Sequence, residues 1–157
     1  MTDTVRGPFI VIGENIHATR VLLRNGARVA SLPDGRPALP FIDDDGGAQL
    51  LPVPGTALEG AGEKQKVKHV KAAVLAGLAG GADAALGRGY VRFLARRQAE
   101  AGADYLDLNV DEASNDVDGR VAAIRWLVAA VEDATPLAMN EYKVEITKAL
   151  VRRALLA

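Results

Sequence analysis

The chain has 157 residues, of which 49% are hydrophobic and 25% charged, and its formal net charge is -1 at pH 7. This composition is typical of a globular domain with its own core, and the balanced charge gives no reason to expect nucleic acid or an anionic membrane as a partner. No run of 18 apolar residues occurs, so no membrane span is expected, and the absence of cysteine excludes disulfides and a cysteine nucleophile. Because the N-terminus lacks the charged-then-apolar pattern of a secretion signal, the expected location is the cytoplasm.

The first predicted element is a buried strand over residues 9–12, a continuous apolar run that Gly13 ends. Its polar tip contains Glu14, Asn15 and His17. Glu14 and Asn15 fit two roles equally well, capping the next segment or contacting a ligand. His17 could act as an acid near neutral pH, although a hydrogen-bonding role in a loop is the commoner one for such a residue.

Residues 21–60 interrupt the alternation of strands and helices. Short strands at 28–32 and 38–42 flank a turn at 33–36, and a polar turn at 43–47 leads to a third strand at 49–53. The pattern predicts a small antiparallel meander, followed by a loop at 54–62. The acidic turn at 43–45 lacks the spacing of a calcium loop, so we expect it to be solvated.

Helical periodicity covers residues 63–80, 84–101 and 118–134. Gly80 and Gly81 are expected to end the first of these helices, and Asp116 or Asp118 to cap the third. His69 stands among lysines, so a surface position is expected, whereas Trp126 is expected to pack on the core. Residues 136–140 predict another strand, and 144–156 a last helix. The apolar faces of the first and third helices are expected to carry the core residues Val67, Val70, Val74, Leu75 and Leu78, and Val121, Ile124, Leu127, Val128 and Val131.

The most informative strand is 105–109, where Leu106 and Leu108 alternate with Asp107 and Asn109. It follows a helix and precedes another, which is the order found in β/α barrels, where chemistry takes place at the C-terminal ends of the strands. The expected fold is therefore α/β, a partial TIM-type barrel of three βα units with the meander inserted after the first strand. A closed barrel needs eight such strands. We therefore expect a fragment of a longer product or a chain that assembles with another polypeptide, the other option being a compact three-stranded domain.

Three strand tips carry a resemblance to a known family: residues 12–15, 106–109 and 137–140. Together with the block from Ala101 to Glu112, they resemble the pterin-binding β/α barrels, and in particular the methyltetrahydrofolate–corrinoid methyltransferase branch. That branch includes the folate domain of cobalamin-dependent methionine synthase. The resemblance implies that residues 1–157 are the N-terminal portion of such a barrel and that residues 21–60 are an insertion within it.

The resemblance also implies an activity, which is methyl transfer from N5 of methyltetrahydrofolate to a corrinoid (cobalamin) held by a partner protein or domain. The pterin would be bound by Glu14, Asn15, Asp107, Asn109 and Asn140, with no metal on the barrel and no catalytic residue assigned. Asn140 stands where the family has an aspartate that accepts two hydrogen bonds from the pterin. An amide offers a single acceptor oxygen, so this departure predicts weaker pterin binding.

Two alternatives remain open. A dihydropteroate synthase-like pterin enzyme is one, although the D-I-G-G sequence of those enzymes is absent from the second strand. The other is a non-catalytic binding or assembly module that kept the fold. The expected partners are folate, a corrinoid protein and either the remainder of the barrel or a second copy of the chain.

Overall fold

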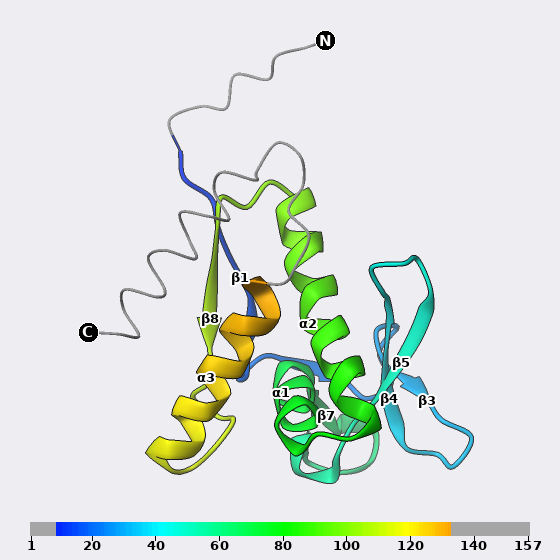
Figure 1. Cartoon of the computed structure of the whole chain (residues 1–157). Helices are drawn as coiled ribbons and strands as arrows, with labels where there is room; N and C mark the ends of the chain where they lie inside the picture. The colour runs from blue at the N-terminus through cyan, green and yellow to red at the C-terminus, as the bar shows by residue number, and fades with distance from the viewer. Residues whose placement is uncertain (1–8, 133–157) are drawn as a thin grey trace.

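A computed structural model describes residues 9–132, which form a mixed α/β structure of three small sheets and three α-helices (Figure 1). Within these residues the sheets do not close into a barrel. The strand expected at 136–140, the helix expected at 144–156 and Asn140 lie outside the described residues. No helix between residues 9 and 132 combines the length and the apolarity that a bilayer crossing requires.

Strands β1 (Ile12–His17) and β8 (Tyr105–Asn109) form a parallel pair. The chain passes from one to the other through helices, as a parallel connection requires. The predicted position of the first strand, residues 9–12, was wrong by several residues. Tyr105, the first residue of β8, pairs with Ile12, so the ladder begins there and extends through the segment expected to be a loop tip. Phe9 is 83% exposed rather than buried.

The predicted meander is confirmed as β3 (Ala30–Ser31), β4 (Pro37–Ile42) and β5 (Ala48–Pro52), which pair antiparallel in that order. The turn between β4 and β5 is built on Asp43, whose carboxylate accepts hydrogen bonds from the backbone of Asp45 and Gly47. Asp44 is not merely solvated as expected, since it forms ion pairs with Arg92 and Arg96 on α2 (Ala82–Glu100). These pairs connect the meander to the helical layer.

A further sheet was not predicted. β2 (Val21–Leu23) and β6 (Leu58–Glu59) each pair antiparallel with β7 (Lys66–Lys68). β6 lies between short 3₁₀ turns at Gly55–Ala57 and Gly62–Lys64. The helix expected from residue 63 was therefore wrong at its start, and α1 covers His69–Ala79. Pairing on both edges of β7 outweighs the helical periodicity of its residues. Val67 is buried as expected, but it belongs to a strand and not to a helix.

Helices α2 and α3 lie within about two residues of their expected ranges, and α1 ends where it was expected to end. α1 and α2 are separated by Gly80 and Gly81, both at positive φ, and α3 covers Val117–Glu132. Asp116 is the residue that caps α3, because its Oδ1 accepts the backbone N–H of Gly119 at 2.7 Å. Leu78 and Val121, expected on the core faces, are 44% and 38% exposed.

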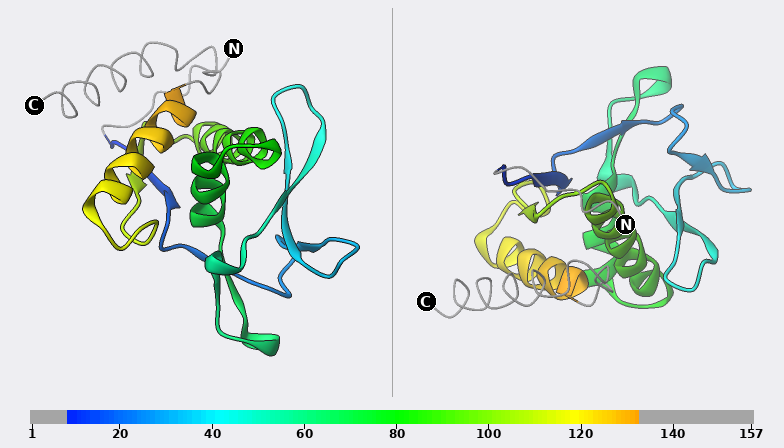
Figure 2. Two further views of the ribbon diagram at one scale, coloured as in Figure 1. Left: turned by 60° about the horizontal axis from the view of Figure 1, so that its bottom comes forward. Right: turned by 90° about the horizontal axis from the view of Figure 1, so that it is seen from above.

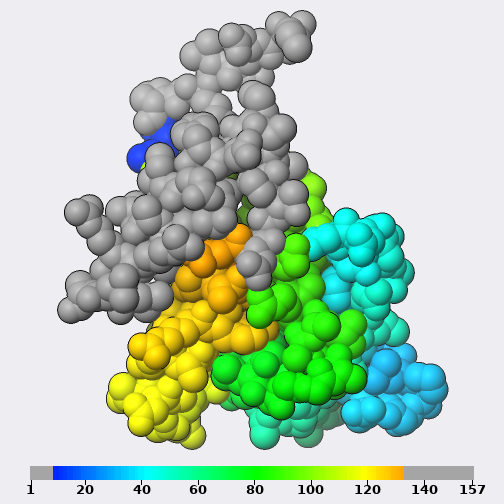
Figure 3. Space-filling view, in the orientation of Figure 1, coloured from blue at the N-terminus to red at the C-terminus, as the bar shows by residue number. Residues whose placement is uncertain are grey.

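The helices form the centre of the molecule (Figures 1 and 2). α1 and α2 lie between the β1–β8 pair with α3 on one flank and the meander on the other. The space-filling view shows α3, the α1–α2 helices and the meander next to one another in that order (Figure 3). The largest side chains buried between these layers come from all of them: Ile16, Leu39, Leu51, Val67, Val70, Val74, Val91 and Leu127. Trp126 packs against this core, as predicted.

Candidate functional site

The C-terminal ends of β1 and β8 lie side by side and carry polar side chains. Leu106 and Leu108 pack against the core, so alternation places Asp107 and Asn109 on the opposite face of β8. The carboxylate of Asp107 accepts a hydrogen bond from His17 of β1, at 3.0 Å between Oδ2 and Nε2. The side chain of His17 is 16% exposed and that of Asp107 is 54% exposed. The structure thus joins two residues that are 90 positions apart in the chain.

Asn109 is occupied by its own loop. Its Nδ2 donates to Oδ2 of Asp111 at 2.8 Å, and its Oδ1 accepts the backbone N–H of Asp111 at 2.9 Å. This is the local turn that Asx side chains commonly form at the end of an element. Asn109 lies at the C-terminal end of β8, where the site was predicted. Both of its polar groups, however, stabilise the loop that follows this strand.

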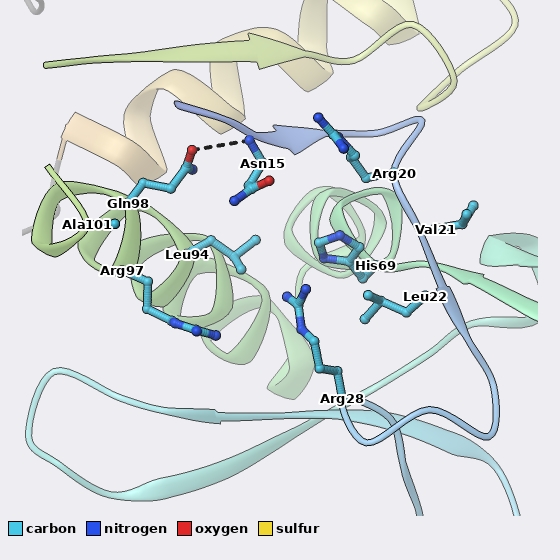
Figure 4. A pocket seen from close by; sticks show the side chains of 10 residues that line it. All are labelled: Asn15, Arg20, Val21, Leu22, Arg28, His69, Leu94, Arg97, Gln98 and Ala101. Carbon is cyan, nitrogen blue, oxygen red and sulfur yellow. Dashed lines mark hydrogen bonds between the residues drawn. The ribbon is translucent and has the colours of Figure 1, made fainter. Parts of the chain in front are cut away.

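Glu14 and Asn15 have contacts with residues other than Asp107. Glu14 is exposed and lies 3.7 Å from Arg20. The backbone N–H of Asn15 donates to Oε1 of Gln98 on α2, and its side chain lines a pocket on the helical side of β1 (Figure 4). The irregular register between Gly13 and Ile16 accompanies this change of face. Asn15, predicted to bind the same ligand as Asp107, therefore lies on the other side of β1.

The acidic loop after β8 is connected to the second sheet by Lys68. Its Nζ forms ion pairs with Glu112 of that loop and with Glu59 of β6, the latter at 3.3 Å. The hydrogen bond to Glu112 is the main reason that the pKa of Lys68 is raised. Lys68 therefore belongs to a strand, and its ion pairs join the loop after β8 to the sheet of β2, β6 and β7.

The pocket beside Asn15 has a volume of about 290 Å³ and lies between β1, the connection to β2 and the C-terminal half of α2 (Figure 4). Sequence reasoning missed it, because its residues come from segments that no local pattern relates. Three of the lining side chains are arginines, and none is acidic. The residues that line it are Asn15, Arg20, Val21, Leu22, Arg28, His69, Leu94, Arg97, Gln98 and Ala101.

His69, expected at the surface, is only 3% exposed, so that expectation was wrong. It begins α1 where α2 packs closely, and its Nδ1 is 2.9 Å from the hydroxyl of Tyr90. Burial lowers the pKa of His69 to about 4, and the charges of Arg28 and Arg20 act in the same direction. Burial also raises the pKa of Tyr90 to about 12. Both groups are therefore neutral at physiological pH.

Between residues 9 and 132, no three histidine or acidic side chains come close enough together to hold a metal ion. Comparisons of the chain with protein-family models, with curated proteins and with solved structures find no match. Two features of the described residues therefore indicate the function. One is the rim, formed by His17 and Asp107 at the ends of β1 and β8, and the other is the arginine-lined pocket.

Proposed function

We propose that this chain is part of a pterin-binding β/α barrel that transfers the methyl group of N5-methyltetrahydrofolate to a corrinoid on a partner protein or domain. The observation that supports it most is the parallel pairing of β1 with β8, which brings His17 and Asp107 together at the ends of two strands. In β/α barrels this end of the strands is where substrates bind. The resemblance of the block from Ala101 to Glu112 supplies the substrate class.

The side chains of the rim suit a pterin in part. Asp107 is half-exposed, and a carboxylate can accept two hydrogen bonds from the 2-amino group and ring N–H of a pterin. Asn109 fits less well, because its amide would have to leave Asp111 before it could contact a ligand. Asp107 is therefore the residue on which pterin affinity should depend most.

His17 is the candidate proton donor. The N5 amine is a poor leaving group, so it must gain a proton or a strong hydrogen bond as the methyl group departs. An imidazole is suited to this role near neutral pH, and the carboxylate of Asp107 would orient it. The corrinoid would supply the cobalt that accepts the methyl group, and the rim residues would bind and orient the pterin.

The partial-barrel part of the proposal rests on the state of the β1–β8 pair. Each of the two strands pairs on one edge only within the described residues. Phe9, Ile10, Val11 and Ile12 are between 49% and 83% exposed. Further strands, from the rest of a barrel or from a second copy, would pair with these edges and cover these side chains.

A second candidate is a non-catalytic binding or assembly module with the same fold. The observation that favours it is the closed contact of Asn109 with Asp111, which removes one polar group from the rim. The two candidates differ in whether the chain binds a pterin at all.

Calorimetric titration of the full chain with methyltetrahydrofolate tests the proposal. We expect saturable binding at millimolar ligand or below, and p-aminobenzoylglutamate, which lacks the pterin, should not displace the ligand. Asp107→Asn should weaken binding about tenfold or more, because a charge-assisted pair is lost. Asp118→Asn, at the exposed start of α3, is the matched control for the loss of one carboxylate and should weaken it far less. Absence of heat at millimolar methyltetrahydrofolate would reject the enzyme and favour the module.

A further inference from the structure

The arginine-lined pocket is chemically distinct from the rim. We propose that it binds a small organic anion, whose carboxylate or phosphate group is held by Arg28 and Arg97 and whose apolar part lies on Val21, Leu22 and Leu94. This inference does not depend on the proposed methyl transfer. It follows from the charge of the pocket, from its size and from one lining donor that is buried and has no acceptor among the described residues.

The charge of the pocket is one-sided. Arg28 and Arg97 approach it from different segments, the loop before β3 and helix α2 (Figure 4). Arg28 lies near enough to Tyr90 to lower the pKa of its hydroxyl, and Arg97 lies over the ring of Phe93, 5.6 Å from its centroid. Neither makes an ion pair with an acidic residue of the described part of the chain. Guanidinium groups gathered without carboxylates favour an external oxyanion, which they bind in a bidentate manner.

Gln98 provides an independent indication of a ligand. Its side chain is only 6% exposed and its Oε1 accepts the backbone N–H of Asn15, but its buried Nε2 has no acceptor among the described residues. A buried donor without a partner is costly, so such groups usually have a ligand or a water molecule as acceptor. An anionic oxygen in the pocket would supply that acceptor.

The lowered pKa of His69, which also lines the pocket, agrees with a positive potential there. Beyond its burial, the charges of Arg28 and Arg20 are what lower its pKa. Arg20 is partly compensated by Glu14, which lies 3.7 Å away and outside the pocket. The pocket therefore remains positive where Arg28 and Arg97 enter it.

The size of the pocket indicates a ligand of about one ring. Its volume of about 290 Å³ is at the lower end of the range for small-molecule sites. A cavity of about 150 Å³ holds a benzene molecule, so the pocket has room for a ring and an acid group. The apolar side chains of its lining would contact the ring, and this predicts that an organic anion binds more tightly than inorganic phosphate.

The test is titration of the full chain, at constant ionic strength, with phenyl phosphate, phenylacetate, inorganic phosphate and neutral benzyl alcohol. We expect saturable binding of phenyl phosphate or phenylacetate, weaker binding of inorganic phosphate and none of benzyl alcohol. The tighter of the first two identifies the acid group. Binding should also shift the side-chain amide resonance of Gln98, which places the ligand in this pocket.

Variants decide whether the arginines are responsible. Arg97 is exposed, so Arg97→Gln should leave the fold intact while it weakens binding about tenfold. Arg28→Gln should do the same, with thermal unfolding as a check that the fold around Tyr90 is kept. Arg125, on the exposed face of α3, lies outside the pocket lining, and Arg125→Gln controls for the loss of one charge. Equal weakening by Arg97→Gln and Arg125→Gln, or no saturable binding of either organic anion, would overturn the inference.

Discussion

His69 shows how strongly the environment of one residue changes its chemistry. It is buried against Tyr90, and the charges of Arg28 and Arg20 further disfavour the imidazolium form. The pKa of His69 is about 4, compared with an ordinary value of 6.5. The unfolded chain therefore binds a proton at this residue at a higher pH than the folded chain does. Stability from this group is complete above pH 6.5 and is lost as the pH falls towards 4.

This linkage predicts a measurable pH dependence. Between pH 7 and pH 4 the wild-type chain should lose about 3 kcal/mol of unfolding free energy that is specific to His69. His69→Gln cannot titrate but can still hydrogen-bond Tyr90, so its stability should fall less over the same range. Urea unfolding at pH 7, 5 and 4 measures both slopes.

Equal slopes for the two proteins would contradict the buried neutral state of His69. The carboxylates with lowered pKa, Asp34, Asp43 and Asp116, titrate below their ordinary value of 3.8. They are present in both proteins, so their contribution cancels in the comparison.

Residue positions were predictable where a local pattern governs them. The alternation of Leu106 and Leu108 with Asp107 and Asn109 placed the two kinds of side chain on opposite faces, as the structure has them. The burial of His69 was not predictable from its lysine neighbours, since it depends on Tyr90, which is 21 residues further along. The contact between His17 and Asp107 likewise required the parallel register.

Among the elements, helices α1 and α2 owe their close approach to Gly87. A Cβ at this position would lie 2.5 Å from the carbonyl oxygen of Ala73, a backbone atom that cannot rotate away. The Gln98 and Leu94 side chains of the pocket are on the same helix, so the position of α2 also determines the shape of the pocket.

Gly87→Ala should therefore destabilise the chain by about 1–3 kcal/mol through overpacking, although alanine favours helix by about 1 kcal/mol. Gly55→Ala is the matched control, because a Cβ there meets no atom within 4 Å. Chemical denaturation of both variants provides the measurement. A Gly87→Ala protein as stable as the Gly55→Ala protein would show that the helices are not packed this closely.

Elements were predictable in proportion to how local their pairing is. The meander is joined by short turns with clear turn residues, and it was predicted with its order correct. β2 and β7 pair across more than 40 residues of chain and contain three residues each, so no periodicity marks them. The start of β1 was misplaced because the apolar run at 9–12 marks hydrophobicity, whereas the ladder begins where β8 provides partners.

At the scale of the whole molecule, the β1–β8 pair is a two-stranded sheet whose outer edges find no partner strand among residues 9–132. Exposed apolar side chains run along its beginning, and Ile12 within β1 is 59% exposed. An exposed strand edge of this kind favours pairing with another chain. Additional strands would cover these side chains, and this supports the proposal of a partial barrel.

We therefore expect the isolated chain to associate as its concentration rises, measured by sedimentation velocity. Ile12→Lys should reduce this association, because charged residues on an edge strand oppose pairing. Leu23→Lys is the matched control, since Leu23 is 61% exposed but lies on β2 in a different sheet. A monomer at all concentrations, or an equal effect of the two variants, would contradict the expectation.

The central claim is that the rim formed by His17 and Asp107 binds a pterin. The most direct measurement is a nuclear Overhauser experiment on the full chain with methyltetrahydrofolate carrying a ¹³C-labelled N5-methyl group. We predict cross-peaks between this methyl group and the ring protons of His17, lost in the Asp107→Asn variant. Bound ligand whose methyl group contacts only residues of the arginine-lined pocket, or no bound ligand at all, would contradict the account.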